Sequence, residues 1–179
     1  MGTAEANALI ASTRELPRRA GERRAWRQTV PAPADLGVAM IGVPEGSPIA
    51  LDLSLESASE GIWVSGPVDV HLVGQCVRCL TSLDEARTFQ LQELYYYPGR
   101  DADEDALFVT NDQIDLEPAL RDAVVLELPF SPLCRPDCAG LCPVCGADLN
   151  ETPDHRHDDP VDPRWAALQD LGTSDKSNC

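Results

Sequence analysis

The sequence lacks any run of 18 apolar residues, which excludes a membrane-spanning helix of ordinary length. Its first residues, Met-Gly-Thr-Ala-Glu-Ala-Asn, lack the basic-then-apolar pattern of an export signal, so we expect a cytoplasmic protein. Positive charge is also scarce, because 14 Lys and Arg residues stand against 30 Asp and Glu residues, for a net charge of -16. This net negative charge excludes binding of nucleic acid or anionic lipid that is driven mainly by electrostatic attraction to the whole protein surface.

Common catalytic motifs are absent as well. The sequence contains no nucleophile elbow, Walker loop, dinucleotide-binding glycine pattern or HExxH motif. We therefore expect no enzyme, no catalytic residues and no small-molecule substrate. The length of 179 residues suits one compact domain with an attached module, and 43% hydrophobic residues are enough to form a core.

Seven cysteines need an explanation, because disulfides are rare in the reducing cytosol. Six of them and two histidines form four pairs with the spacing of metal ligands: Cys76 and Cys79, Cys134 and Cys138, Cys142 and Cys145, and His155 and His157. Thiolate sulfur and imidazole nitrogen select zinc over magnesium or calcium. Eight such ligands predict two Zn²⁺ ions per chain in closed tetrahedral sites, which are structural because no position remains for water.

Two arrangements of these pairs are open. The first joins Cys76 and Cys79 to the pair at Cys134 and Cys138, and leaves a local knuckle made of Cys142, Cys145, His155 and His157. The second places the four cysteines from 134 to 145 on one ion. We favour the first arrangement. A CxxC redox switch is the alternative to zinc, but it does not explain the two histidines.

The chain between residues 49 and 130 is predicted to form an antiparallel sheet and one helix. Apolar and polar residues alternate over 51–55, over 68–72 and over 89–92, the last running on into 95–97, which is typical of strands with one wet face. A further short pattern at 62–64 is divided from 68–72 by Gly66-Pro67. A helix is expected from Asp115, with Pro118 in its first turn, to just before Pro129. Residues 101–105 are expected to form an exposed acidic loop, and residues 162–171 a second short helix. The predicted fold class is α+β, an antiparallel sheet with one main helix and a zinc-knuckle C-terminal segment.

Charge and composition divide the chain into four parts. We expect a basic arm over 1–29, a sheet-and-helix body over 30–130, a zinc-binding segment over 131–171 and a frayed tail over 172–179. The arm is a candidate nucleic-acid contact through Arg18, Arg19, Arg23, Arg24 and Arg27. The simpler interpretation is that these arginines pair with acidic neighbours in the body. No aromatic ladder accompanies them, so the arm alone does not predict base stacking.

Three motifs together resemble one known family. They are Gly74-Gln-Cys-Val-Arg-Cys-Leu80, Cys134-Arg-Pro-Asp-Cys-Ala-Gly-Leu-Cys-Pro-Val-Cys-Gly-Ala-Asp-Leu-Asn150 and Asp162-Pro-Arg-Trp-Ala-Ala-Leu168. The combination is similar to the YceD family, which is named for the accumulation of large-subunit ribosomal RNA. Many relatives carry Cys-x-Cys where this chain has His155-Arg-His157, and some shorter relatives keep only ligands like the first set. The resemblance therefore supports two sites and the first arrangement.

The resemblance implies a cytoplasmic ribosome-biogenesis factor needed for normal levels of large-subunit (23S) ribosomal RNA. Its genes often sit beside that of a small zinc-binding ribosomal protein. An acidic body with a short arginine-rich arm suits a basic partner better than RNA. We therefore expect a non-enzymatic assembly adaptor for a large-subunit ribosomal protein or a precursor ribosomal particle. The alternatives are direct stabilisation of ribosomal RNA by binding, and a thiol-based redox sensor.

Overall fold

The computed structural model describes residues 8–100, 102–157 and 164. Two compact units divide the chain after Cys138. The first contains the sheet and the helix, and the second begins at Ala139 and contains the second CxxC pair. Within the described ranges, no helix is long and apolar enough to cross a membrane.

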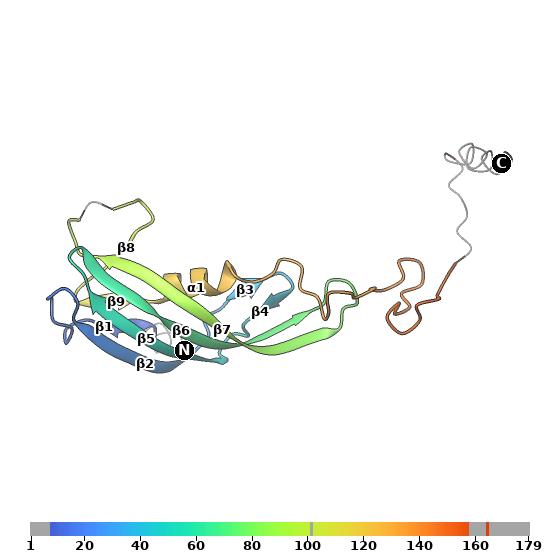
Figure 1. Cartoon of the computed structure of the whole chain (residues 1–179), viewed down its shortest axis with the longest axis horizontal. Helices are drawn as coiled ribbons and strands as arrows, with labels where there is room; N and C mark the ends of the chain where they lie inside the picture. The colour runs from blue at the N-terminus through green and yellow to red at the C-terminus, as the bar shows by residue number, and fades with distance from the viewer. Residues whose placement is uncertain (1–7, 101, 158–163, 165–179) are drawn as a thin grey trace, which may run out of the picture. The chain divides into compact units, whose positions relative to one another are not determined.

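Four long strands form the centre of the first unit and run antiparallel in the order β2-β5-β6-β7 (Figure 1). Their bounds are β2 (Arg23–Pro31), β5 (Pro48–Ser57), β6 (Gly61–Gln75) and β7 (Ser82–Tyr96). The last two form a hairpin that pairs along all 15 residues, from Gly61 with Tyr96 to Gln75 with Ser82. The first CxxC pair therefore lies in the loop at the tip of this hairpin.

Short elements complete the first unit. β4 pairs with the end of β6 beyond β5, and β8 pairs in parallel with the end of β7. β1 and β9 form a separate two-stranded sheet, and α1 follows β9 directly. Their bounds are β1 (Ile10–Ser12), β3 (Gly37–Val38), β4 (Ile41–Gly42), β8 (Leu107–Phe108), β9 (Gln113–Asp115) and α1 (Glu117–Val125).

The core lies on one face of the sheet, because side chains alternate along each strand. Leu51, Leu53 and Leu55 of β5 are buried, whereas the residues between them are exposed or half-buried. α1 contributes the buried side chains of Leu120 and Val124 to the same core. The burial of apolar side chains in this core is the main favourable contribution to folding.

The predicted antiparallel sheet and helix are confirmed. The two strand patterns at 62–64 and 68–72 belong to one continuous strand, β6. Asp115 accepts a hydrogen bond at Oδ1 from the backbone N–H of Glu117 at 3.0 Å, although Leu116 is the N-cap residue. Pro118 lies in the first turn as expected. The expected short helix at 162–171, except Arg164, and the tail at 172–179 lie outside the described residues.

The segment from Arg23 to Pro31 is a strand, which the weak sequence pattern before residue 49 did not predict. β2 is the first strand of the sheet, and within the described part of the chain it pairs only with β5. An edge strand buries little on either face, so charged residues are tolerated along it and the usual alternation of apolar residues is lost. The second half of the basic arm is thereby fixed to the body.

Candidate metal centres

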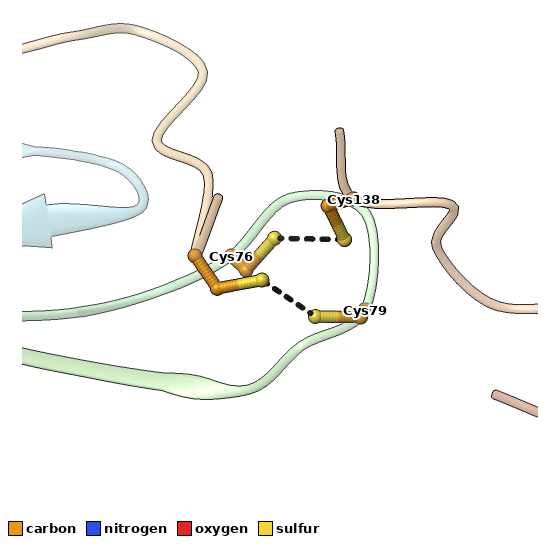
Figure 2. A group of neighbouring side chains, drawn as sticks. Cys76, Cys79 and Cys138 are labelled. Atoms are coloured by element: carbon orange, nitrogen blue, oxygen red, sulfur yellow. Dashed lines mark hydrogen bonds between the residues drawn. The ribbon is translucent and has the colours of Figure 1, made fainter. Parts of the chain in front are cut away.

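The first cluster joins the tip of the β6–β7 hairpin to the segment after α1. The Sγ atoms of Cys76 and Cys138 lie 3.8 Å apart (Figure 2). Those of Cys79 and Cys134 lie 3.6 Å apart. All four sulfur atoms lie within 4.8 Å of one another. A tetrahedral zinc site with Zn–S bonds of about 2.3 Å has edges of about 3.8 Å. The four sulfur atoms therefore fit one tetrahedral ion.

Two further hydrogen bonds hold the hairpin tip against that segment. The backbone N–H of Val77 donates to the carbonyl oxygen of Pro132 at 3.0 Å. The guanidinium of Arg78 donates to the carbonyl oxygen of Cys138 at 2.8 Å. These contacts preorganise the four thiols, because they fix the two chain segments independently of any sulfur atom.

The thiols of the first cluster differ in acidity. Burial opposes ionisation of Cys76, but hydrogen bonds from the backbone of Cys79, Cys134 and Arg78 outweigh it and lower the pKa of this thiol to about 6. Hydrogen bonds with the hydroxyl and backbone of Thr81 lower the pKa of Cys79. The thiol of Cys134 has its pKa raised to about 12 by its hydrogen bond with Cys79 and by desolvation. A divalent cation bound to the four sulfur atoms would favour the thiolate form of each.

The second cluster lies in the second unit and combines two cysteines with two histidines. The Sγ atom of Cys145 lies 3.1 Å from Nε2 of His155 and 3.3 Å from Nε2 of His157. The two Nε2 atoms are 2.8 Å apart. Cys142 completes the group, and one ligand atom from each residue lies within 4.8 Å of the others. Both imidazoles turn Nε2 toward the Sγ atom of Cys145, so a single ion could bind both nitrogens together with the sulfur.

Cys142 is buried, whereas Cys145 and His157 are exposed. Hydrogen bonds from the backbone of Cys145 and Val144 lower the pKa of the Cys142 thiol to about 6, despite its desolvation. One thiolate is thus available near neutral pH before any metal binds. The donor set, two sulfur atoms and two neutral nitrogens, is typical of structural zinc.

The two CxxC loops have the same backbone geometry. In the first, Leu80 N–H donates to Cys76 O at 2.9 Å, and Cys76 N–H donates to Thr81 O at 2.9 Å. In the second, Gly146 N–H donates to Cys142 O and Cys142 N–H donates to Ala147 O, both at 2.8 Å. The fifth residue of each loop has a left-handed backbone, with φ of 61° at Leu80 and 76° at Gly146. Two separate segments therefore form the same ligand-presenting turn.

The described structure thus groups the eight candidate ligands as in the first of the two arrangements considered above. That these groups bind zinc stays a prediction. The third histidine, His71, belongs to neither group, and its Nε2 atom lies 2.8 Å from Oδ1 of Asp84. Cys179 lies outside the described residues.

Three residues that support the first cluster were missed in the sequence. Arg78 and Thr81 contact the cysteines or their backbone, and Leu80 occupies the left-handed position that glycine fills in the second loop. Comparison of the two loops aligns Leu80 with Gly146 and could have indicated the turn. The long-range contact of Arg78 with Cys138 has no local signal.

The arginines predicted as a nucleic-acid contact are engaged with acidic residues to a large extent. Among the residues that the structure describes, four ion pairs involve them, namely Arg18 with Asp112 at 3.2 Å, Arg23 with Glu56 at 2.8 Å, Arg24 with Glu15 at 2.6 Å, and Arg27 with Asp52 at 2.8 Å. Arg19 lies in the turn before β2 and its side chain is exposed. Pairing of this kind reduces the positive potential that the arm presents to a phosphate.

Comparison with known proteins finds similar proteins in several bacteria and in one plant. The chain is 43% identical over 171 residues to an uncharacterized protein of Mycobacterium tuberculosis, which covers 93% of this chain and 82% of that protein. It is 27% identical over 123 residues to YlbN, an uncharacterized protein of Bacillus subtilis, covering 67% of this chain and 69% of YlbN. No solved structure matches the chain significantly.

Two matches carry a functional name. A maize chloroplast protein named as a YCED homolog of the large ribosomal RNA subunit accumulation protein is 45% identical over 40 residues, or 22% of this chain and 14% of the maize protein. The model of the family described as large ribosomal RNA subunit accumulation protein YceD matches residues 64–172. These residues include both candidate metal centres and make up more than half of the sequence. The chain therefore belongs to the YceD family, whose name assigns it a role in the accumulation of large-subunit ribosomal RNA.

Proposed function

We propose that the chain is a non-enzymatic, zinc-stabilised adaptor that acts in the cytoplasm during assembly of the large ribosomal subunit and thereby supports accumulation of 23S ribosomal RNA. The observation that carries the proposal is the convergence of eight sulfur and imidazole groups into two four-membered sets in a member of the YceD family. Four ligands close each site, so neither leaves the open position that catalytic zinc uses for water or substrate.

Zinc fits both donor sets. Cys76, Cys79, Cys134 and Cys138 would hold one ion, with a net charge of -2 for four thiolates around Zn²⁺. Cys142, Cys145, His155 and His157 would hold the other in a neutral site. When bound, zinc supplies free energy of folding, on the order of 10 kcal/mol per site in small modules. In the first unit it would fix the hairpin tip to the segment after α1.

The charge distribution favours a basic protein as the partner. The full chain carries a net charge of -16, and four arginines of the arm are engaged by carboxylates. RNA would bring further negative charge to this surface, whereas a large-subunit ribosomal protein, free or in a precursor particle, would bring positive charge. The adaptor would hold such a protein, or shield it from other RNA, until it is placed in the particle.

Affinity capture with the tagged full chain tests this proposal. Cells are lysed, the sample is divided, and one half is treated with RNase before capture. We expect large-subunit ribosomal proteins in both halves, because the contact is with protein. Recovery of these proteins only in the untreated half would indicate that RNA is the direct partner and would contradict the adaptor. Recovery of no large-subunit protein or precursor particle in either half would reject it altogether.

A further inference from the structure

An apolar stripe crosses the solvent-facing side of the sheet at the end away from the CxxC hairpin tip. Trp63 of β6 pairs with Leu94 of β7, and Tyr96 of β7 pairs with Phe108 of β8. The Tyr96 and Phe108 rings lie 6.2 Å apart between centroids. Trp63 is 38% exposed and Phe108 is 41% exposed, although both belong to strands of the sheet. We call these four residues the aromatic face.

The aromatic face is continuous because of one glycine. Gly61 lies opposite Tyr96 and two positions before Trp63 on the same side of β6. A Cβ atom at Gly61 would overlap the carbonyl oxygen of Tyr95, so the close approach of the two strands requires glycine here. With no side chain between them, Trp63 and Tyr96 are diagonal neighbours on one surface.

Acidic residues lie next to the aromatic face, on β5 and in the adjoining loops. Glu56 of β5 lies directly opposite Trp63. Glu60 lies in the turn between β5 and β6, where its backbone carbonyl oxygen accepts a hydrogen bond from the backbone N–H of Tyr97. Three exposed acidic residues stand in the loop just before β8, namely Asp103, Glu104 and Asp105. Two arginines near these acidic residues are already bound to other groups. Arg23 forms an ion pair with Glu56 at 2.8 Å, and Arg100 donates a hydrogen bond to the carbonyl oxygen of Ser59 at 2.8 Å.

We infer that the aromatic face is the docking surface for a basic segment of a protein, with an apolar or aromatic side chain seated on Trp63 and Phe108 and lysines or arginines set against Asp103, Glu104 and Asp105. This inference rests on the proposed adaptor function and assigns its contact surface. An apolar centre with a charged border is the arrangement that protein interfaces use, with aromatic residues as energetic anchors. The border supplies attraction at a distance and orients the partner.

Charge distinguishes this partner from RNA. Exposed aromatic side chains on a sheet can stack on bases, but such surfaces combine stacking with a positively charged track for the phosphates. Here the track would consist of carboxylates, with Arg23 already neutralised by Glu56. Phosphates would be repelled from this face. The same carboxylates attract the lysine and arginine side chains in which ribosomal proteins are rich.

Immobilised full-length chain provides the test, with two probes used separately: total large-subunit ribosomal proteins freed of RNA, and protein-free ribosomal RNA. The variants are Trp63→Ala, Phe108→Ala and the double charge reversal Asp103→Lys with Glu104→Lys. Phe130→Ala is the matched control, because Phe130 is 86% exposed and lies in the segment after α1, outside the aromatic face. The charge reversal changes only exposed loop side chains, so it tests the surface even where an aromatic substitution disturbs folding.

We expect wild type and Phe130→Ala to retain the basic proteins equally, and each aromatic variant to retain them at least tenfold more weakly. The charge reversal should lower retention and flatten its dependence on salt. If wild type retains the ribosomal proteins and all three variants retain them equally well, the aromatic face is not the docking surface. The proposed adaptor function would not be contradicted by that result. No retention of protein by wild type would overturn both. Retention of RNA that is lost in Trp63→Ala, or a dimer of the chain that Trp63→Ala dissociates, would also overturn the inference.

Discussion

The Sγ atom of Cys76 lies 3.8 Å from the Sγ atom of Cys138, although 62 positions separate the two residues in the chain. This contact connects the tip of the longest hairpin with the end of the first unit. Loop closure over such an interval costs conformational entropy, which sulfur–sulfur contacts do not offset. A metal ion bound to both residues would offset it, because its affinity is added to the free energy of folding.

Single cysteine substitutions should separate the two sites. Cys76→Ser and Cys134→Ser should each remove one zinc ion and keep the other, because both residues belong to the first cluster. Cys142→Ser should remove only the second ion, and Cys179→Ser, at the one cysteine outside the four candidate ligand pairs, should remove none. Elemental analysis of the purified variants measures this. Loss of the same ion in Cys134→Ser and Cys142→Ser would show that the ligands are grouped differently.

The shared turn of the two CxxC loops predicts unequal losses of zinc affinity in two matched substitutions. Gly146→Ala places a Cβ in a left-handed conformation and should cost about 1 kcal/mol, or roughly fivefold in zinc affinity at the second site. Leu80→Gly relieves the same strain at φ of 61° but adds flexibility to the unfolded chain, so the net change should be below about 1 kcal/mol. Metal competition with a chromogenic chelator measures both affinities. A larger loss in Leu80→Gly than in Gly146→Ala would contradict the equivalence of the loops.

The buried phenol of Tyr95 predicts a loss of stability in alkali. Burial, together with the nearby charges of Glu93 and Asp115, raises the pKa of Tyr95 well above 10 in the folded state. Because the folded pKa is the higher one, the stabilisation is complete below pH 10 and is lost as the pH rises above it. Tyr95→Phe should flatten this decline in urea unfolding experiments.

At neutral pH, Tyr95→Phe should itself cost about 1 kcal/mol. The substitution removes the hydrogen bond from the Tyr95 hydroxyl to the carbonyl oxygen of Asp115, which is 2.7 Å long. Tyr96→Phe is the control, because Tyr96 belongs to the half-exposed side of the same strand. An unchanged alkaline decline in Tyr95→Phe would show that another group causes it.

The ion-paired arginines of the arm should contribute little to RNA binding. Arg23→Ala and Arg27→Ala together remove two guanidinium groups that already pair with Glu56 and Asp52. The pairs are largely exposed, so the free energy of unfolding should change by no more than about 1 kcal/mol for each. Filter binding to ribosomal RNA at several salt concentrations should show the same weak affinity in wild type and variant. A steep salt dependence in wild type that is reduced in the variant would indicate direct phosphate contacts.

Local patterns in the sequence were sufficient for the elements with a buried face. The alternation of Leu51, Leu53 and Leu55 with polar residues predicted a strand of β5, and Pro118 with the stripe at Leu120 and Val124 predicted α1. Spacing alone singled out the four candidate ligand pairs that the structure brings together in two groups. These features are local, because each depends on residues within a few positions of one another.

The features that were missed depend on distant residues. β2 has no apolar alternation because it lies at the edge of the sheet, and its pairing with β5 was not visible in the chain. The aromatic face assembles Trp63, Tyr96 and Phe108 from three strands, so no window of sequence contains it. Likewise, the two arrangements of ligand pairs could be distinguished only after the hairpin placed Cys76 beside Cys138.

Zinc content and its link to folding are tested most directly by elemental analysis of the purified full chain, followed by thermal melting with and without a chelator. We predict two zinc ions per chain and a large decrease in the melting temperature when they are removed, because metal binding contributes to folding. A protein that contains no metal, is fully folded, and melts at the same temperature in the presence of chelator would contradict the account.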